Sequence, residues 1–121
     1  MNIHESAEDY LERILMIKQE KGNVRSIDIA NDMNFSRASV SHAMKLLKEN
    51  KYIEIDENGN IELLEKGNEI AENILHRHHL LTNLFIKIGV DEKIAQQDAC
   101  KIEHDLSKET FAAIEKLVEN L

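Results

Sequence analysis

Apolar residues recur at helical spacing along most of the chain, beginning with residues 6–20. The inner positions of this first predicted helix are Leu11, Ile14 and Ile17. Ser6 and Asp9 fit a capping box at its start, with Ser6 as N-cap, and Gly22 predicts its end. The first predicted element is therefore an amphipathic helix.

Two more helical patterns follow, and only three residues separate them. Ser26 is placed to cap a short helix over residues 27–33, whose inner positions are Ile29 and Ala30. After a predicted turn, Ser36 can cap a longer helix that runs to about Asn50. The buried stripe of this longer helix consists of Val40, Met44 and Leu47. Two helices joined by so short a turn predict a helix-turn-helix.

Alternation with a period of two replaces helical spacing after residue 51. Residues 52–55 and 61–63 alternate between apolar and polar side chains on either side of the segment DENGN. The Asn58-Gly59 pair in that segment favours a β-hairpin. A hairpin directly after the second helix of a helix-turn-helix is a wing.

Three further helices are predicted after the hairpin. The first starts near Glu65 and ends at Gly89; its stripe is Ile70, Ile74, His78, Leu81, Phe85 and Ile88. Asp91 can cap the next helix, which is expected to reach Leu106, and Ser107 can cap the last. The chain is thus predicted to be mainly α. We expect a winged helix-turn-helix domain over residues 1–70 and an all-helical metal-binding and dimerisation domain over residues 71–121.

The second half has few apolar residues with which to build a large core of its own. Leu80, Leu84 and Ile86 lie off the inner stripe of their helix, so that helix is apolar on more than one side. Surplus apolar surface of this kind predicts burial against a second copy of the chain. The expected interface residues are Leu80, Leu84, Ile86, Phe111, Ile114 and Leu117.

Composition excludes several classes of protein. The 121 residues are 42% hydrophobic and 31% charged, with no Pro and four Gly, which is typical of a helical globular protein. No apolar run approaches the ~20 residues of a membrane span, and no N-terminal secretion signal is present. The single cysteine excludes an internal disulfide and fits a reducing compartment. We expect a cytoplasmic protein without a membrane partner.

The charge distribution favours DNA as a partner despite a net charge of −8. Residues 21–51 hold six basic and three acidic side chains, which is a basic island in an acidic chain. Short polar side chains near the start of the second helix suit base edges, and the basic ones suit phosphates. The expected DNA-contacting residues are Arg25, Ser36, Arg37, Ser39, Ser41, His42, Lys45 and Lys48. An ordinary solvated helix face is the alternative.

Cys100, Glu103 and His104 are spaced to share one helical face. Thiol, carboxylate and imidazole are the side chains that bind divalent transition metals. A solvated polar face with an incidental cysteine is the alternative. Two other features favour metal, since Asp9 and Glu12 form an i, i+3 carboxylate pair and His78 lies on an apolar stripe. Considered alone, a histidine such as His78 on an apolar stripe is more often a hydrogen-bonded core residue, and Asp9 fits a capping role.

The whole pattern resembles the diphtheria-toxin-repressor and manganese-transport-regulator family of metal-dependent bacterial repressors. The most specific segments are residues 6–12 (SAEDYLE), 77–81 (RHHLL) and 99–107 (ACKIEHDLS). The resemblance implies that the metal ligands are Asp9, Glu12, His78, Cys100, Glu103 and His104. Many members append a small β-barrel, which is not expected in a chain ending at Leu121. Thr82 and Gln96 replace the Glu and His of the second metal site found in iron-sensing members.

The identity of the metal is less clearly defined by the same comparison. Manganese-sensing members carry a carboxylate at the position of Cys100, whereas iron-sensing members carry Cys there and Met at the position of Asp9. Because the chain mixes the two patterns, we expect Fe²⁺ or Mn²⁺, with iron slightly favoured and Co²⁺ or Zn²⁺ as possible substitutes in vitro.

The function implied is repression of metal-uptake genes by a homodimer on an operator in double-stranded DNA. A metal-independent winged-helix regulator is the alternative, and a metallohydrolase is a more distant one. No separate general base is evident, so we expect neither catalytic residues nor a small-molecule substrate.

Overall fold

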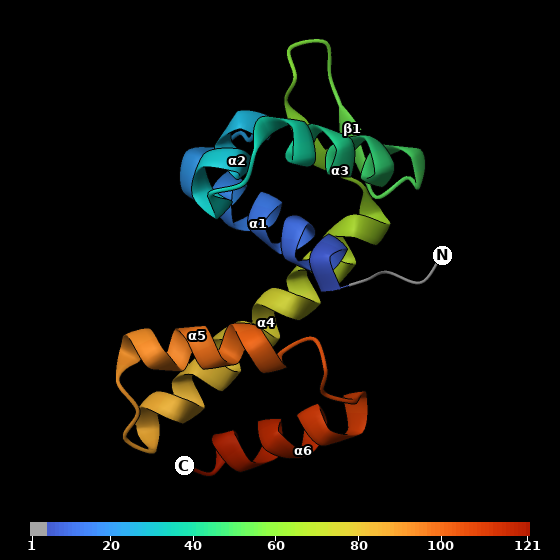
Figure 1. Ribbon diagram of the computed structural model, residues 1–121. Helices are drawn as coiled ribbons and strands as arrows, with labels where there is room; N and C mark the ends of the chain where they lie inside the picture. Colours follow the sequence, from blue (N-terminus) through green and yellow to red (C-terminus); the bar gives the residue numbers. More distant parts are fainter. Residues whose placement is uncertain (1–4) are drawn as a thin grey trace. The chain divides into compact units, whose positions relative to one another are not determined.

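The computed structural model describes residues 5–121, which form six α-helices and one two-stranded sheet (Figure 1). The elements are α1 (Glu5–Lys21), α2 (Ser26–Met33), α3 (Arg37–Glu49), β1 (Ile53–Ile55), β2 (Ile61–Leu63), α4 (Glu65–Lys87), α5 (Glu92–Ile102) and α6 (Lys108–Glu119). A first compact unit ends at Glu72, and a second covers Asn73–Leu121. Every predicted element is present, and the predicted winged helix-turn-helix is confirmed.

The core of the first unit consists of the residues that helical periodicity placed inside. Leu11, Ile14, Val40 and Ile29 are fully buried, and Met44 is almost so. Burying each such side chain contributes roughly 1.5–3 kcal/mol, which stabilises short helices that would not persist alone. Arg13 on α1 also pairs with Asp32 on α2 at 3.2 Å.

The turn between α2 and α3 depends on two residues. Asn34 adopts a left-handed conformation with φ 58°, which asparagine tolerates better than most side chains. Ser36 then caps α3 as predicted, because its Oγ accepts a 3.1 Å hydrogen bond from the backbone N–H of Ser39. The prediction for α2 was wrong in detail. Ser26 is the first helical residue, and Arg25 occupies the N-cap with its backbone N–H donating to Asp28 Oδ2 at 2.9 Å.

Strands β1 and β2 pair antiparallel, with Ile55 opposite Ile61, and form the wing. Five residues connect them, and Asp56 Oδ1 accepts hydrogen bonds from the backbone N–H groups of Asn58 and Asn60. The wing is fixed to the segment before α2, where the Ile61 N–H donates to the Val24 carbonyl at 2.8 Å. This bond holds the wing beside the N-terminus of α2.

Helices α5 and α6 belong to the second unit, together with the part of α4 after Glu72. Asp91 and Ser107 cap α5 and α6 as predicted, since each side chain accepts a backbone N–H from the first turn. Two details differ from expectation. Helix α5 ends at Ile102 rather than Leu106, and Ile88 lies beyond α4 with 66% of its surface exposed.

Candidate metal centre and DNA-binding surface

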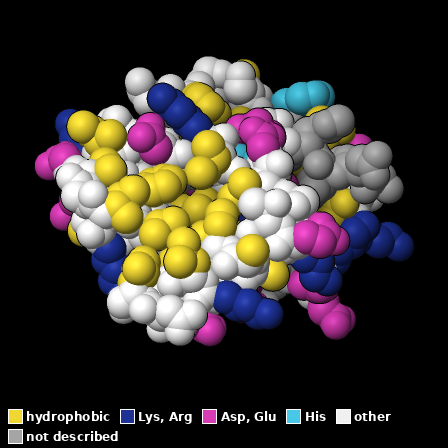
Figure 2. Space-filling view, turned by 90° about the horizontal axis from the view of Figure 1, so that it is seen from below, with side chains coloured by type: hydrophobic (Ala, Val, Ile, Leu, Met, Phe, Trp, Pro, Cys, Tyr) yellow, Lys and Arg dark blue, Asp and Glu magenta, His cyan; other side chains and the backbone are white. Residues whose placement is uncertain are grey.

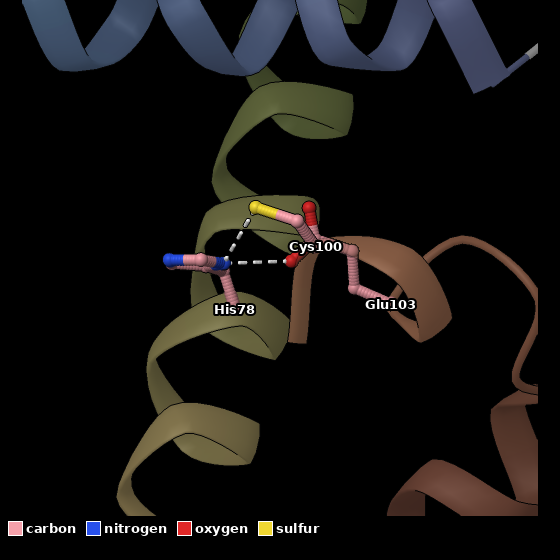
Figure 3. Close-up of side chains that lie close together, drawn as sticks. All are labelled: His78, Cys100 and Glu103. Carbon is pink, nitrogen blue, oxygen red and sulfur yellow. Dashed lines mark hydrogen bonds and ion pairs between the residues drawn. The ribbon is translucent and has the colours of Figure 1, made fainter. Parts of the chain in front are cut away.

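Three of the predicted ligands lie together in the second unit (Figure 3). His78 extends from α4, Cys100 from α5, and Glu103 is the residue that follows α5. The Nδ1 of His78 is 2.9 Å from Glu103 Oε2 and 3.7 Å from Cys100 Sγ. One nitrogen, one sulfur and one oxygen thus lie within 4.8 Å of one another.

The same contacts set the charge of the imidazole. The hydrogen bond with Cys100, followed by that with Glu103, raises the pKa of His78 to about 10, although burial opposes the shift. His78 is therefore an imidazolium at neutral pH and donates its Nδ1 proton to the Glu103 carboxylate. The proton occupies the place between the donor atoms where a cation would bind.

These residues fit a divalent transition ion. Metal bonds of about 2.0–2.3 Å bring donor atoms to about 3–4 Å from one another, and the 2.9 and 3.7 Å contacts match that range. Glu103 is fully buried, and within residues 5–121 its Oε1 has no hydrogen-bond partner. A buried carboxylate oxygen without a donor is costly in a protein interior unless a cation compensates for it.

His104 is placed differently from the prediction. Glu103 is the C-cap of α5 and keeps its helical spacing from Cys100, because its backbone N–H donates to the Ala99 carbonyl at 3.0 Å. His104 lies beyond the end of this helix and does not continue the face that Cys100 and Glu103 share. The His104 side chain is 2% exposed, and its Nε2 lies 3.5 Å from Glu103 Oε1. Glu103 therefore presents one carboxylate oxygen to each imidazole, Oε2 to His78 and Oε1 to His104.

Asp9 and Glu12 belong to α1 in the first unit. Glu12 is 3% exposed, whereas Asp9 is half-buried. The predicted capping box was wrong in its geometry, because Ser6 lies inside α1 rather than before it. That both carboxylates are metal ligands stays a prediction from the sequence.

The predicted DNA-contacting side chains lie on the open face of the helix-turn-helix. Exposed side chains on α3 and just before α2 make up this set: Arg25, Arg37, Ser39, Ser41, His42, Lys45 and Lys48. Ser36 is also exposed, although its oxygen caps α3. The α-carbon of Gly59 in the wing faces Arg25, and a Cβ there would lie 3.3 Å from two guanidinium nitrogens. The Arg25 guanidinium therefore lies against the wing at Gly59.

The second unit carries a large apolar patch on the face seen from below in Figure 2. Ile86, Ile88, Leu117 and Leu121 are among the large hydrophobic side chains that are more than one-third exposed. Of the other predicted interface residues, Leu80, Leu84 and Ile114 are half-buried. Phe111 is an exception, since only 7% of it is exposed and its own chain already covers it.

Across residues 5–121, none of the helices combines the length and apolar character that a membrane span requires.

A winged helix-turn-helix followed by a helical unit with a cluster of candidate metal ligands is the arrangement expected of a metal-responsive DNA-binding protein. Sequence comparison agrees. Residues 2–60 match the family "Iron dependent repressor, N-terminal DNA binding domain", and residues 64–121 match "Iron dependent repressor, metal binding and dimerisation domain". The HTH-type transcriptional regulator MntR of Shouchella clausii is 36% identical over 114 residues, which cover 94% of this chain and 80% of MntR.

Solved structures share the fold. The T. acidophilum IdeR crystal structure has a TM-score of 0.79 at 26% identity, covering 96% of this chain and 54% of IdeR. A manganese-dependent transcriptional repressor in complex with manganese has a TM-score of 0.85 at 23% identity, covering 93% and 52%. The chain thus spans about half the length of these two proteins. It belongs to the diphtheria-toxin-repressor and manganese-transport-regulator family, whose members are metal-dependent transcriptional repressors and not enzymes.

Proposed function

We propose that this protein binds operator DNA as a homodimer when Fe²⁺ or Mn²⁺ occupies the centre at His78, Cys100 and Glu103, and that it thereby represses metal-uptake genes. The observation that carries the proposal is the convergence of these three donors within 4.8 Å of one another in a chain that also has a winged helix-turn-helix. A bound cation would take over from the His78 proton in balancing the charge of the buried Glu103 carboxylate.

Further ligands are proposed from the sequence and the family. His104 is a candidate because its ring already lies beside Glu103 Oε1. Asp9 and Glu12 are candidates because their i, i+3 spacing directs both carboxylates from one face of α1. The full proposed set is Asp9, Glu12, His78, Cys100, Glu103 and His104.

Coupling to DNA would begin with charge. The three carboxylates repel one another when they are drawn to one centre without a cation, and neutralising them removes that cost. Helix α1 carries two of these three carboxylates. Its Arg13 pairs with Asp32 on α2, the helix that precedes α3, which we propose as the recognition helix. Movement of α1 would therefore reach α3. By linkage, DNA and metal must strengthen the binding of each other by the same factor.

The homodimer is proposed to use the exposed apolar patch of the second unit. Pairing there would bury Leu80, Leu84, Ile86, Ile114 and Leu117, and a two-fold axis would present two copies of α3. Two recognition helices that read successive major grooves must lie ~34 Å apart. Contacts to bases are proposed for Ser39, Ser41 and His42, and contacts to phosphates for Arg25, Lys45 and Lys48.

The direct test is DNA binding with Mn²⁺, Fe²⁺, Co²⁺ and Zn²⁺ titrated separately under anaerobic conditions. The DNA would be genomic fragments selected by the metal-loaded protein. We expect at least about tenfold tighter binding with the favoured ion than with a chelator, a factor worth about 1.4 kcal/mol. The variant Glu103→Gln should lose this response and keep its fold. Equal binding with ion and with chelator would instead indicate a metal-independent regulator.

A further inference from the structure

Three consecutive residues of α4, His76 to His78, each contact the part of the chain from Glu103 to α6. The ring nitrogen Nε2 of His76 lies 2.7 Å from Glu115 Oε2 on α6. His78 contacts the Glu103 carboxylate. Between them, Arg77 takes the backbone, since its Nη1 donates to the carbonyl oxygen of Glu103 at 3.1 Å and to that of Leu106 at 2.7 Å. The main chain and the side chain of Glu103 are thus held by adjacent residues of one helix.

The guanidinium is itself fixed in place. Its central carbon lies 5.0 Å from the centre of the Phe111 ring, a cation–π arrangement on a residue that is nearly fully buried. Arg77 is therefore enclosed between the Phe111 ring on one side and two carbonyl oxygens on the other. A planar group that donates two hydrogen bonds from a fixed position constrains the segment from Glu103 to Leu106 more tightly than packing alone would.

We infer that Arg77 is a positioning residue for the metal centre: by binding the Glu103 and Leu106 carbonyls, it holds Glu103 and His104 at the distance from His78 that a metal ion requires. The inference rests on the proposed function. Glu103 is the C-cap of α5: its backbone N–H makes a last helical hydrogen bond to the Ala99 carbonyl at 3.0 Å, whereas its own carbonyl is bound from α4 by Arg77. Arg77 thus ties the C-terminal end of α5 to α4, and it directly precedes the proposed ligand His78.

Two other roles for Arg77 predict different results. As a positive charge near a cation site, Arg77 would oppose metal binding, and its removal would then tighten binding. As a purely structural residue, it would affect the melting temperature and leave metal affinity unchanged well below unfolding. Positioning alone predicts weaker metal binding. The direction of the change in affinity therefore separates the three roles.

The experiment measures Co²⁺ affinity by chelator competition in the full chain carrying Arg77→Lys or Arg77→Met. Lysine keeps the charge but is too short to reach both carbonyls, and methionine keeps much of the length without the charge. Positioning predicts that both variants bind Co²⁺ about 10–100-fold more weakly, as expected for outer-shell partners of ligands. Tighter binding by Arg77→Met, or unchanged affinity in both, would overturn the inference.

A double-mutant cycle identifies the ligand through which Arg77 acts. Glu103→Gln removes the carboxylate and keeps the backbone carbonyl that Arg77 binds. The effect of Arg77→Met should largely disappear in the Glu103→Gln background, because contacting residues are not additive. If Glu103→Gln and Cys100→Ser leave Co²⁺ affinity unchanged, the centre lies elsewhere and both proposals fail. If these two weaken binding and the Arg77 variants do not, only the positioning role fails.

Discussion

Glu103 Oε2 lies 2.9 Å from His78 Nδ1, so a fully buried carboxylate accepts the proton of a largely buried imidazole. The pKa of His78, raised to about 10, means that this proton is present throughout the physiological range. Histidine binds metal only as the neutral imidazole. Metal binding must therefore expel a proton from His78.

The first prediction follows from that proton. Between pH 6 and 8, affinity for Co²⁺ should rise with pH, and His78 should contribute about tenfold per unit because one proton is released. Calorimetry in buffers of different ionisation enthalpy measures the released protons directly. The variant His78→Gln should release about one proton fewer than the wild type. A metal affinity that does not change with pH would contradict this assignment.

Stability of the metal-free protein should depend on pH in the opposite sense. Because the folded-state pKa of His78 is raised, its pairing with Glu103 stabilises the fold fully below the unfolded pKa of about 6.5. This contribution is lost as pH rises through about 10. Thermal unfolding of chelator-treated protein from pH 6 to 10 should show a progressive fall in melting temperature. The fall should be smaller in His78→Gln.

A third prediction concerns Cys100 and the choice of ion. Cys100 is the single cysteine, so any thiolate-to-cobalt charge-transfer band must come from it. The Co²⁺-loaded wild type should show this band and Cys100→Ser should not. Thiolate is a softer ligand than carboxylate, so Cys100→Glu should shift activation of DNA binding from Fe²⁺ toward Mn²⁺. A cobalt spectrum and metal ranking unchanged in both variants would show that Cys100 is not a ligand.

The sequence was sufficient for elements whose signals are local. The period of 3.6, the caps Ser36, Asp91 and Ser107, and the alternation in the wing all act within a few residues, so the predicted helices and hairpin were confirmed. Helical spacing also selected Cys100 and Glu103 as neighbours, which the structure brings together with His78.

Errors arose where distant contacts decide the outcome. The pattern continued α5 to Leu106, but the chain leaves the helix after Ile102, and Arg77 binds the carbonyls of Glu103 and Leu106 from α4. No local pattern distinguishes such an arginine from a solvated one. Phe111 was predicted at the dimer interface, but its own chain covers most of its surface. Periodicity shows that a residue is buried, not whether its own chain or a partner buries it, so contact with a second copy stays a prediction.

A fourth prediction compares two glycines that have similar backbone conformations. Gly22 and Gly59 both have positive φ, 90° and 84°, but a Cβ at Gly22 meets nothing within 4 Å, whereas one at Gly59 meets the Arg25 guanidinium. Alanine at either position should cost about 1–2 kcal/mol of stability through backbone strain. Only Gly59→Ala should displace Arg25 and weaken DNA binding, which electrophoretic mobility shifts at constant metal would measure.

The control for the comparison of Gly22 with Gly59 is the Gly59→Ala substitution in a protein that lacks Arg25. In an Arg25→Ala background, Gly59→Ala should have little further effect on DNA affinity, because the displaced group is already absent. If Gly59→Ala weakens DNA binding equally in both backgrounds, or if Gly22→Ala weakens it as much, the effect comes from the wing backbone and not from Arg25.

The last prediction separates phosphate from base contacts on α3. Lys48 is exposed near the C-terminal end of this helix, and His42 is exposed in its N-terminal half. Removing a phosphate contact lowers affinity for all sequences alike and reduces the slope of log affinity against log salt by about 1, because one fewer counterion is released. Lys48→Ala should show both effects, whereas Lys116→Ala on α6, an equal change in charge, should leave the slope unchanged.

The substitution His42→Ala should keep the salt slope but reduce the ratio of operator affinity to random-sequence affinity. If the ring contacts a base edge, the loss of discrimination should be about 1–3 kcal/mol. A lower slope without loss of specificity in His42→Ala would assign that residue to the backbone instead.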